Sequence, residues 1–197
     1  MNGYELLRAA HQRVVDLERG LLTHFLGKPI GEGYENLVFA LKDPKKVIKV
    51  KKPIAFKTDI QYRRPQEHTL IPNASTCIKT YGGSIGHLVV ERLGSNLGHY
   101  EGFSEEFKQA PDKRIITFLE QLVEQLDANE IEHRDIHPGN ILEAPESEYG
   151  FKLIDFSWAR RKDKRISEFP RPLNQYYSPN DKAAIEKMIR EVEAFYR

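Results

Sequence analysis

The segment His133-Arg-Asp-Ile-His-Pro-Gly-Asn140 decides how the rest of the sequence is interpreted. It places two imidazoles, a guanidinium, a carboxylate and an amide between the helical pattern of residues 112–129 and an apolar run at 140–143. An ordinary connector does not need so many functional side chains. A polar turn in which Asp135 caps a helix is the plain alternative. Yet His-Arg-Asp followed by asparagine at this spacing should arise by chance in only roughly one chain in a thousand of this length.

A second carboxylate, Asp155, follows the apolar run 151–154. Together with the run at 140–143, this pattern predicts a hairpin that ends beside the polar loop. Carboxylate and amide oxygens suit magnesium, which usually keeps substrate phosphates among its ligands. Phosphoryl transfer needs a metal, charge neutralisation and an oriented hydroxyl. The sequence therefore predicts that Asp135 takes the hydroxyl proton and that Asn140 and Asp155 bind the metal.

These residues resemble the protein-kinase-like superfamily. His133-Arg-Asp135 is similar to its catalytic loop, Asn140 to its second metal ligand, and Asp155-Phe-Ser157 to its DFG element. The resemblance implies ATP and Mg²⁺ as cofactors, with His133, Arg134 and Asp135 in the catalytic loop.

Two departures from the superfamily pattern stand in the same region. His137 replaces the lysine usually found two residues after the catalytic aspartate, and in this the segment resembles aminoglycoside and related small-molecule phosphotransferases. Ser157 replaces the glycine of the DFG element, which puts the usual flip of that element in doubt.

The resemblance also implies nucleotide-binding residues upstream. The stretch 30–38 is similar to the glycine-rich loop over the phosphates, with Gly31 and Gly33 as its first glycines and Asn36 in place of the third. A simple turn is the alternative for this stretch. The stretch 46–49 is similar to the strand lysine motif and implies Lys49 as the clamp on the α- and β-phosphates, unless Lys49 is only an exposed strand lysine.

Two further assignments follow from the same resemblance. Glu67 is the candidate for the helix carboxylate that pairs with Lys49, although it could equally be a solvated helix residue. The stretch 88–93 is similar to the hinge, where backbone groups at Glu91 and Leu93 would meet the adenine. An ordinary core strand is the alternative for that stretch.

The apolar patterns predict an α+β fold. The resemblance implies a minimal, atypical two-lobed kinase-like domain over residues 1–197, with an antiparallel N-lobe sheet at about 21–92 and a truncated helical C-lobe at about 93–197. A helix over 3–19, ending at Gly20, should precede it and pack its apolar stripe on the next element. The remaining predicted elements are strands at 37–41, 47–50, 78–81, 87–91, 140–143 and 151–154 and helices at 65–71, 112–129 and 181–196.

Composition narrows the classes of partner. Thirty basic and 29 acidic residues give a net charge of +1, which does not indicate binding to nucleic acid or to an anionic membrane. The one cysteine, Cys77, cannot form an internal disulfide and is expected to be a buried thiol. No apolar run approaches the length of a membrane span. We expect a soluble monomer.

The short C-terminal part bears on the substrate. It leaves no room for the helical subdomain of aminoglycoside and choline kinases, and the chain is most similar to the minimal type III-secreted effector kinases of the HopBF family. That resemblance implies Ser/Thr phosphorylation of the ninety-kilodalton heat-shock chaperone in the host cytoplasm. A lipopolysaccharide-core or other small-molecule kinase in the bacterial cytoplasm is the alternative. Asn36 and Ser157 leave open a catalytically weak pseudokinase that acts as a binding module.

Overall fold

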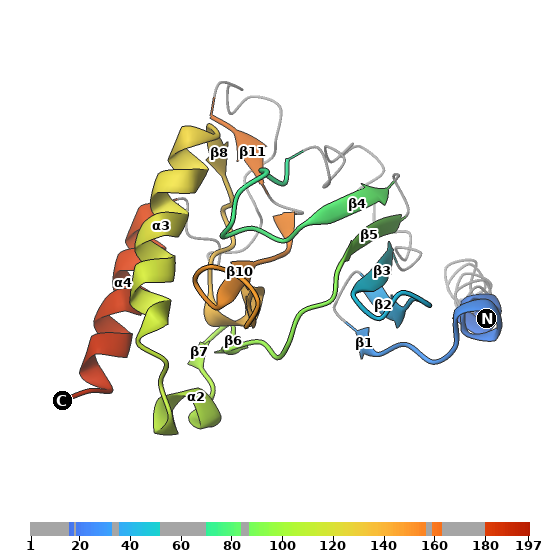
Figure 1. The fold of residues 1–197 in the computed structure, drawn as a ribbon, viewed down its shortest axis with the longest axis horizontal. Helices are drawn as coiled ribbons and strands as arrows, with labels where there is room; N and C mark the ends of the chain where they lie inside the picture. The colour runs from blue at the N-terminus through green and yellow to red at the C-terminus, as the bar shows by residue number, and fades with distance from the viewer. Residues whose placement is uncertain are drawn as a thin grey trace, which may run out of the picture. The chain divides into compact units, whose positions relative to one another are not determined.

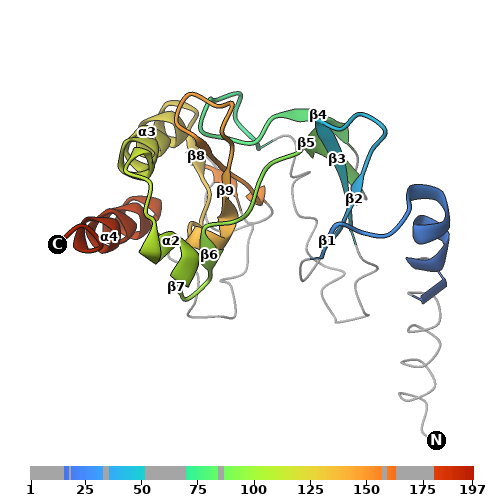
Figure 2. The ribbon, with the colours of Figure 1, turned by 60° about the horizontal axis from the view of Figure 1, so that its bottom comes forward.

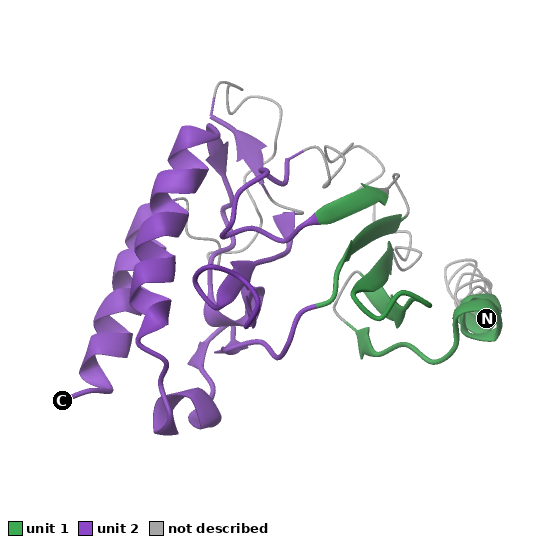
Figure 3. Cartoon of the chain, in the orientation of Figure 1, with its two compact units in different colours: residues 1–63, 80–92 green, residues 64–79, 93–197 purple. Residues whose placement is uncertain are grey.

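The computed structural model has a mixed α+β fold that divides into two compact units (Figure 3). The first unit comprises Met1–Arg63 and Thr80–Arg92, and the second comprises Arg64–Lys79 and Leu93–Arg197. The structure describes residues 16–17, 19–32, 36–51, 70–83, 87–156, 159–162 and 180–197.

A five-stranded antiparallel sheet forms the first unit (Figure 1). Its order is β1-β2-β3-β5-β4. The strands predicted at 37–41 and 47–50 pair as β2 and β3, and those predicted at 78–81 and 87–91 pair as β4 and β5. The turn between β2 and β3 is closed at Asp43, whose side chain accepts the N–H of Lys45 at 3.0 Å and whose carbonyl accepts the N–H of Lys46 at 3.0 Å. The strands are β1 Gly31–Glu32, β2 Asn36–Ala40, β3 Lys46–Lys51, β4 Thr80–Gly83 and β5 His87–Glu91.

The helix before the sheet differs from its prediction. Residues 19–26 are helical, so the helix runs through Gly20. It ends where Gly27, at φ +83°, donates its N–H to the carbonyl of Thr23 at 3.0 Å, a left-handed stop that favours glycine. Leu17, the one residue of the predicted apolar stripe that the structure describes, is 67% exposed and does not pack on the next element as expected. Residues 1–15 of the predicted helix lie outside the described residues.

The second unit is built on two long helices that lie side by side, as Figures 1 and 2 both show. They are α3 Arg114–Ala128 and α4 Asp181–Ala194, both at the places predicted, and a short helix, α2 Glu105–Gln109, precedes α3. Among the helices in the described part of the chain, none combines the length and apolar character needed to cross a bilayer.

Three small two-stranded sheets complete this unit. The predicted hairpin is present as β9 and β10, while the other two pairs were not predicted. A 3₁₀ turn, η3, leads into β9. The elements are β6 Gly98–His99, β7 Gly102–Phe103, β8 Ile131–Glu132, η3 Pro138–Asn140, β9 Ile141–Glu143, β10 Phe151–Leu153 and β11 Arg160–Arg161.

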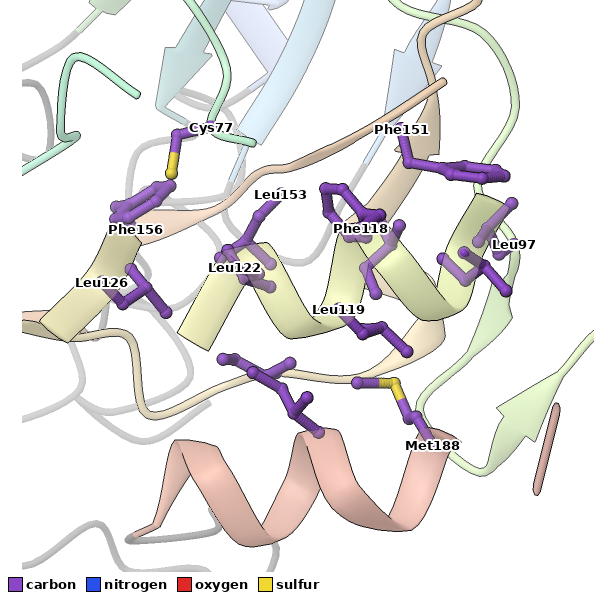
Figure 4. Close-up of a cluster of buried hydrophobic side chains, with 14 of the residues drawn as sticks. Cys77, Leu97, Phe118, Leu119, Leu122, Leu126, Phe151, Leu153, Phe156 and Met188 are labelled. Atoms are coloured by element: carbon purple, nitrogen blue, oxygen red, sulfur yellow. The ribbon is translucent and has the colours of Figure 1, made fainter. Parts of the chain in front are cut away.

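One apolar core joins these elements (Figure 4). α3 supplies a buried stripe that faces both β10 and α4, and the helical spacing of its apolar residues accounts for this. Met188 and Val192 of α4 and Leu153 of β10 are 3%, 0% and 0% exposed. The core therefore fixes the β9–β10 hairpin, whose first strand directly follows the polar loop of residues 133–140.

The segment before β4 also belongs to this core. The N–H of Leu153 donates to the carbonyl of Thr76 at 2.8 Å, and the N–H of Ile78 donates to the carbonyl of Leu153 at 3.0 Å. This pairing explains why β4 begins at Thr80 rather than at the predicted residue 78. Cys77 is a buried thiol, as predicted, and burial raises its pKa to about 12.

Candidate active site

His133 is the buried centre of the loop between β8 and η3. Its ring is 0% exposed and stacks edge to face on Phe156, with centroids 4.7 Å apart. Nδ1 accepts the N–H of Asp135 at 3.3 Å, so the proton of the neutral ring is on Nε2, which donates to the carbonyl of Ile154 at 2.9 Å. Burial lowers the pKa of His133. The buried ring therefore holds the loop in place.

Asp181, at the start of α4, holds the backbone of the same loop. Its Oδ2 accepts the N–H of His133 at 2.6 Å, and its Oδ1 accepts the N–H of Arg134 at 2.8 Å. Arg134 has φ +70°, a left-handed conformation rare for a residue with a side chain. Burial raises the pKa of Asp181, and the two N–H donors offset part of that rise. The sequence did not predict this role of Asp181, although it placed the residue in the first turn of a predicted helix.

Asp135 and Asn140 contact each other directly. The Nδ2 group of Asn140 donates to the carbonyl of Asp135 at 2.9 Å and to its Oδ2 at 3.0 Å. Because both partners are acceptors, the amide orientation is settled and Oδ1 of Asn140 points away from Asp135. The two residues predicted as proton acceptor and metal ligand are thus neighbours in a defined geometry.

Asp155 is brought to this loop by the β9–β10 hairpin. The N–H of Ile154, the residue before it, donates to the carbonyl of Asn140 at 2.9 Å. The carbonyl of Ile154 accepts from His133. Asp155 itself has φ +61°, and such conformations in residues with side chains gather at functional sites. Ser157, the next predicted position, lies outside the described residues.

The side-chain oxygens of Asn140 and Asp155 can supply only some of the ligands that a hard cation needs. Across the residues that the structure describes, no group of three or more histidine, cysteine, aspartate or glutamate side chains is arranged to hold a metal ion. Magnesium commonly takes just one or two carboxylates and completes its octahedron with water and phosphate oxygens. Asn140 and Asp155 therefore fit a nucleotide-borne Mg²⁺ and do not fit a metal site made of protein ligands alone.

His137 stands next to Asp135. Its Nδ1 accepts the N–H of Gly139 at 3.1 Å, and its Nε2 lies 3.7 Å from Oδ1 of Asp135. The ring of Tyr100, in the turn between β6 and β7, meets the imidazole edge to face with centroids 5.2 Å apart. Sequence reasoning noted His137 as a departure but gave Tyr100 no role.

The basic residues after Asp155 are partly paired. Arg160 donates through Nε and Nη2 to Oε2 of Glu132, both at 2.5 Å, across the β8–β11 pair. Burial lowers the pKa of Arg134, and the charge of Arg160 contributes to the same shift. The next residues of the sequence, 163–165, include two more basic side chains and lie outside the described residues.

The first unit carries Gly31, Lys49 and Glu91. Lys49 faces Val38 on one side and Leu88 on the other, so the three share one face of the sheet. A Cβ on Gly31 would lie 3.6 Å from that of Val38, an ordinary contact, so packing does not require glycine there. Glu91 ends β5.

Three predicted site residues, Leu93, Gly33 and Glu67, are not part of the described sheet. Leu93 belongs to the second unit, in the segment before Gly94, whose N–H donates to the carbonyl of Glu143 at 2.8 Å. Gly33 and Glu67 lie outside the described residues, so their predicted roles stay predictions.

Comparisons with known proteins add no identification. No protein-family model matches the chain, and no curated protein matches it.

Proposed function

We propose that the chain is an ATP- and magnesium-dependent phosphotransferase with a minimal kinase-like fold. One observation carries the proposal: Asn140 holds Asp135 through its amide nitrogen and directs its amide oxygen away. The backbone contact of Asn140 with Ile154 brings Asp155 to the same loop. A proton acceptor and two oxygen ligands, carried by one loop and by the strand end bonded to it, are what phosphoryl transfer to a hydroxyl needs.

Each residue has a defined part in this proposal. Asp135 accepts the proton of the attacking hydroxyl, while Asn140 keeps the carboxylate in its rotamer. Asn140 and Asp155 would hold the magnesium ion, which neutralises charge on the nucleotide phosphates. His133 and Asp181 hold the loop backbone rigid. Lys49 is the proposed partner of the α- and β-phosphates, by resemblance.

Within this class we favour a Ser/Thr protein kinase of the secreted-effector type. The support is the family resemblance of the motifs around Asp135 and Asp155. The substrate that the resemblance implies is the ninety-kilodalton heat-shock chaperone, phosphorylated in the host cytoplasm.

The test is transfer of label from γ-labelled ATP, with magnesium, to proteins of a eukaryotic lysate. The purified chain should label a discrete protein, and Asp155→Ala should abolish the label. Glu146→Ala is the matched control, because it removes an exposed carboxylate from the turn between β9 and β10. Absence of label, or equal labelling by Asp155→Ala and Glu146→Ala, would refute the proposal.

A small-molecule or glycan kinase is the second candidate, favoured by the likeness of His137-Pro-Gly139 to small-molecule phosphotransferases. ATP turnover that sugars or lipopolysaccharide stimulate, and that proteins do not, would favour it. Nucleotide binding without any turnover would instead indicate a pseudokinase.

A further inference from the structure

The β6–β7 hairpin presents an aromatic side chain at a fixed place beside the loop. The N–H of Leu97, just before β6, donates to the carbonyl of Ile141 at 3.0 Å, which attaches the hairpin to β9. A Cβ on Gly98 would lie 2.2 Å from the carbonyl oxygen of Gly102, so the close approach of the two strands requires glycine. Tyr100, in the turn of this anchored hairpin, is 43% exposed.

The imidazole of His137 is held between Gly139 and Tyr100. Nδ1 accepts the N–H of Gly139, and a Cβ on Gly139 would lie 2.9 Å from Cε1 of the ring. Tyr100 meets the ring edge to face. Because Nδ1 is an acceptor, the proton of the neutral ring is on Nε2, the atom that faces Asp135.

The two oxygens of Asp135 face different groups. Oδ2 accepts from Asn140, whose own oxygen is the proposed metal ligand. Oδ1 lies 3.7 Å from Nε2 of His137, too far for a direct hydrogen bond. A third oxygen can, however, lie about 2.8 Å from both atoms, a normal hydrogen-bond length to each. The nucleotide side of Asp135 is therefore its Oδ2 side, and a hydroxyl can be received at Oδ1.

We propose that His137 and Tyr100 bind the acceptor, a serine or threonine side chain flanked by an apolar residue; this rests on the proposed function. The hydroxyl donates its hydrogen to Oδ1 of Asp135 and accepts the Nε2–H of His137. Its remaining lone pair forms the bond to the γ-phosphorus of ATP. The bond from that phosphorus to the bridging oxygen breaks, ADP leaves with the electron pair, and Asp135 keeps the proton.

Tyr100 supplies the selectivity. Tyr100 is 43% exposed and its ring contacts that of His137, so an apolar side chain beside the acceptor hydroxyl would lose contact with water against it. The acceptor is therefore a hydroxyl residue in a polypeptide with an apolar residue adjacent to it.

The first test measures phosphorylation of serine peptides that differ only in the residue next to serine. The wild-type chain should prefer leucine or phenylalanine over glycine or aspartate at that position. Tyr100→Ala should remove the preference and raise KM for the leucine peptide about tenfold, the loss expected for one aromatic contact. Tyr100→Phe, which keeps the ring, should retain the preference, and His99→Ala is the control on the same hairpin.

The second test asks whether His137 binds the acceptor hydroxyl or only holds the loop through its hydrogen bond with the N–H of Gly139. In His137→Asn the short side chain can still accept the N–H of Gly139 but no longer reaches Asp135. In His137→Gln the longer side chain can place an N–H near the position of Nε2. His137→Asn should lower kcat/KM for the peptide about ten- to a hundredfold with little change in Tm, and His137→Gln should recover part of the loss.

The outcomes are distinguishable. If the wild-type chain transfers phosphate but the peptide preference survives Tyr100→Ala, or His137→Asn matches the wild type, the acceptor proposal is overturned while the phosphotransferase proposal stands. If the wild-type chain transfers no phosphate to any acceptor, the proposed function fails and this inference fails with it.

Discussion

Replacing Asp181 by asparagine tests how the catalytic loop is held. The carboxylate accepts two backbone N–H groups, one on each oxygen, at 2.6 and 2.8 Å. An amide has only one oxygen, so one N–H would face the NH₂ group and lose its acceptor. A hydrogen bond to a charged group contributes about 1.5–3 kcal/mol. Burial already disfavours the charge of Asp181, so we expect a net loss of about 2 kcal/mol.

Thermal unfolding followed by circular dichroism measures this loss. At roughly 2–4 °C per kcal/mol for a chain of this size, Asp181→Asn should lower Tm by roughly 4–8 °C. Glu186→Gln is the matched control, since it makes the same chemical change at an exposed position of α4. Phosphate transfer should fall together with Tm in Asp181→Asn. A Tm within about 1 °C of that of Glu186→Gln would refute the role of Asp181.

Four further predictions follow from burial and packing. Because burial lowers the pKa of His133, the unfolded chain binds a proton more readily than the folded chain as the pH falls through about 6.5. The stability advantage of wild type over His133→Gln, measured by urea unfolding, should therefore shrink between about pH 7.5 and 5.5. An advantage that stays constant with pH would contradict this. Gly98→Ala should cost about 2 kcal/mol or more, since its Cβ would overlap a carbonyl oxygen, and unchanged urea unfolding would rule out the overlap. Iodoacetamide should modify Cys77 only as the chain unfolds, because burial raises the thiol pKa to about 12, whereas rapid labelling of the folded chain would show the thiol to be accessible. Leu21→Gln should change unfolding free energy by less than about 0.5 kcal/mol, because the side chain is 53% exposed, and a loss of several kcal/mol would mean that this helix face is covered.

Long periodic patterns predicted the parts of the fold with strong local signals. Both long helices and the three hairpins lie where the apolar spacing indicates, because the periods of 3.6 and 2 reflect one buried face. Gly20 was interpreted as a helix stop, but only a glycine in the left-handed conformation ends a helix in this way, and that residue is Gly27. The β6–β7 hairpin has two-residue strands, too short to carry a period.

The sequence predicted which residues carry the chemistry of the candidate site, but not which residues hold them in place. The motif around Asp135 named the residues that carry the chemistry. The sequence could not predict that Asp181 holds the loop, because its partners are 47 and 48 residues away. An aspartate in the first turn of a helix is already explained by its favourable interaction with the helix dipole. Tyr100 became relevant for the same reason: only the tertiary fold brings its hairpin to His137.

The most direct test of the proposed chemistry is the rate of γ-phosphate transfer in a single turnover, compared between the wild-type chain and Asp135→Asn at saturating Mg²⁺ and ATP. Asparagine keeps an oxygen to accept the amide of Asn140 but cannot take the hydroxyl proton. The proposal predicts a transfer rate at least about 10²-fold lower, with nucleotide binding and Tm close to those of wild type. Equal transfer rates in the two proteins would contradict it.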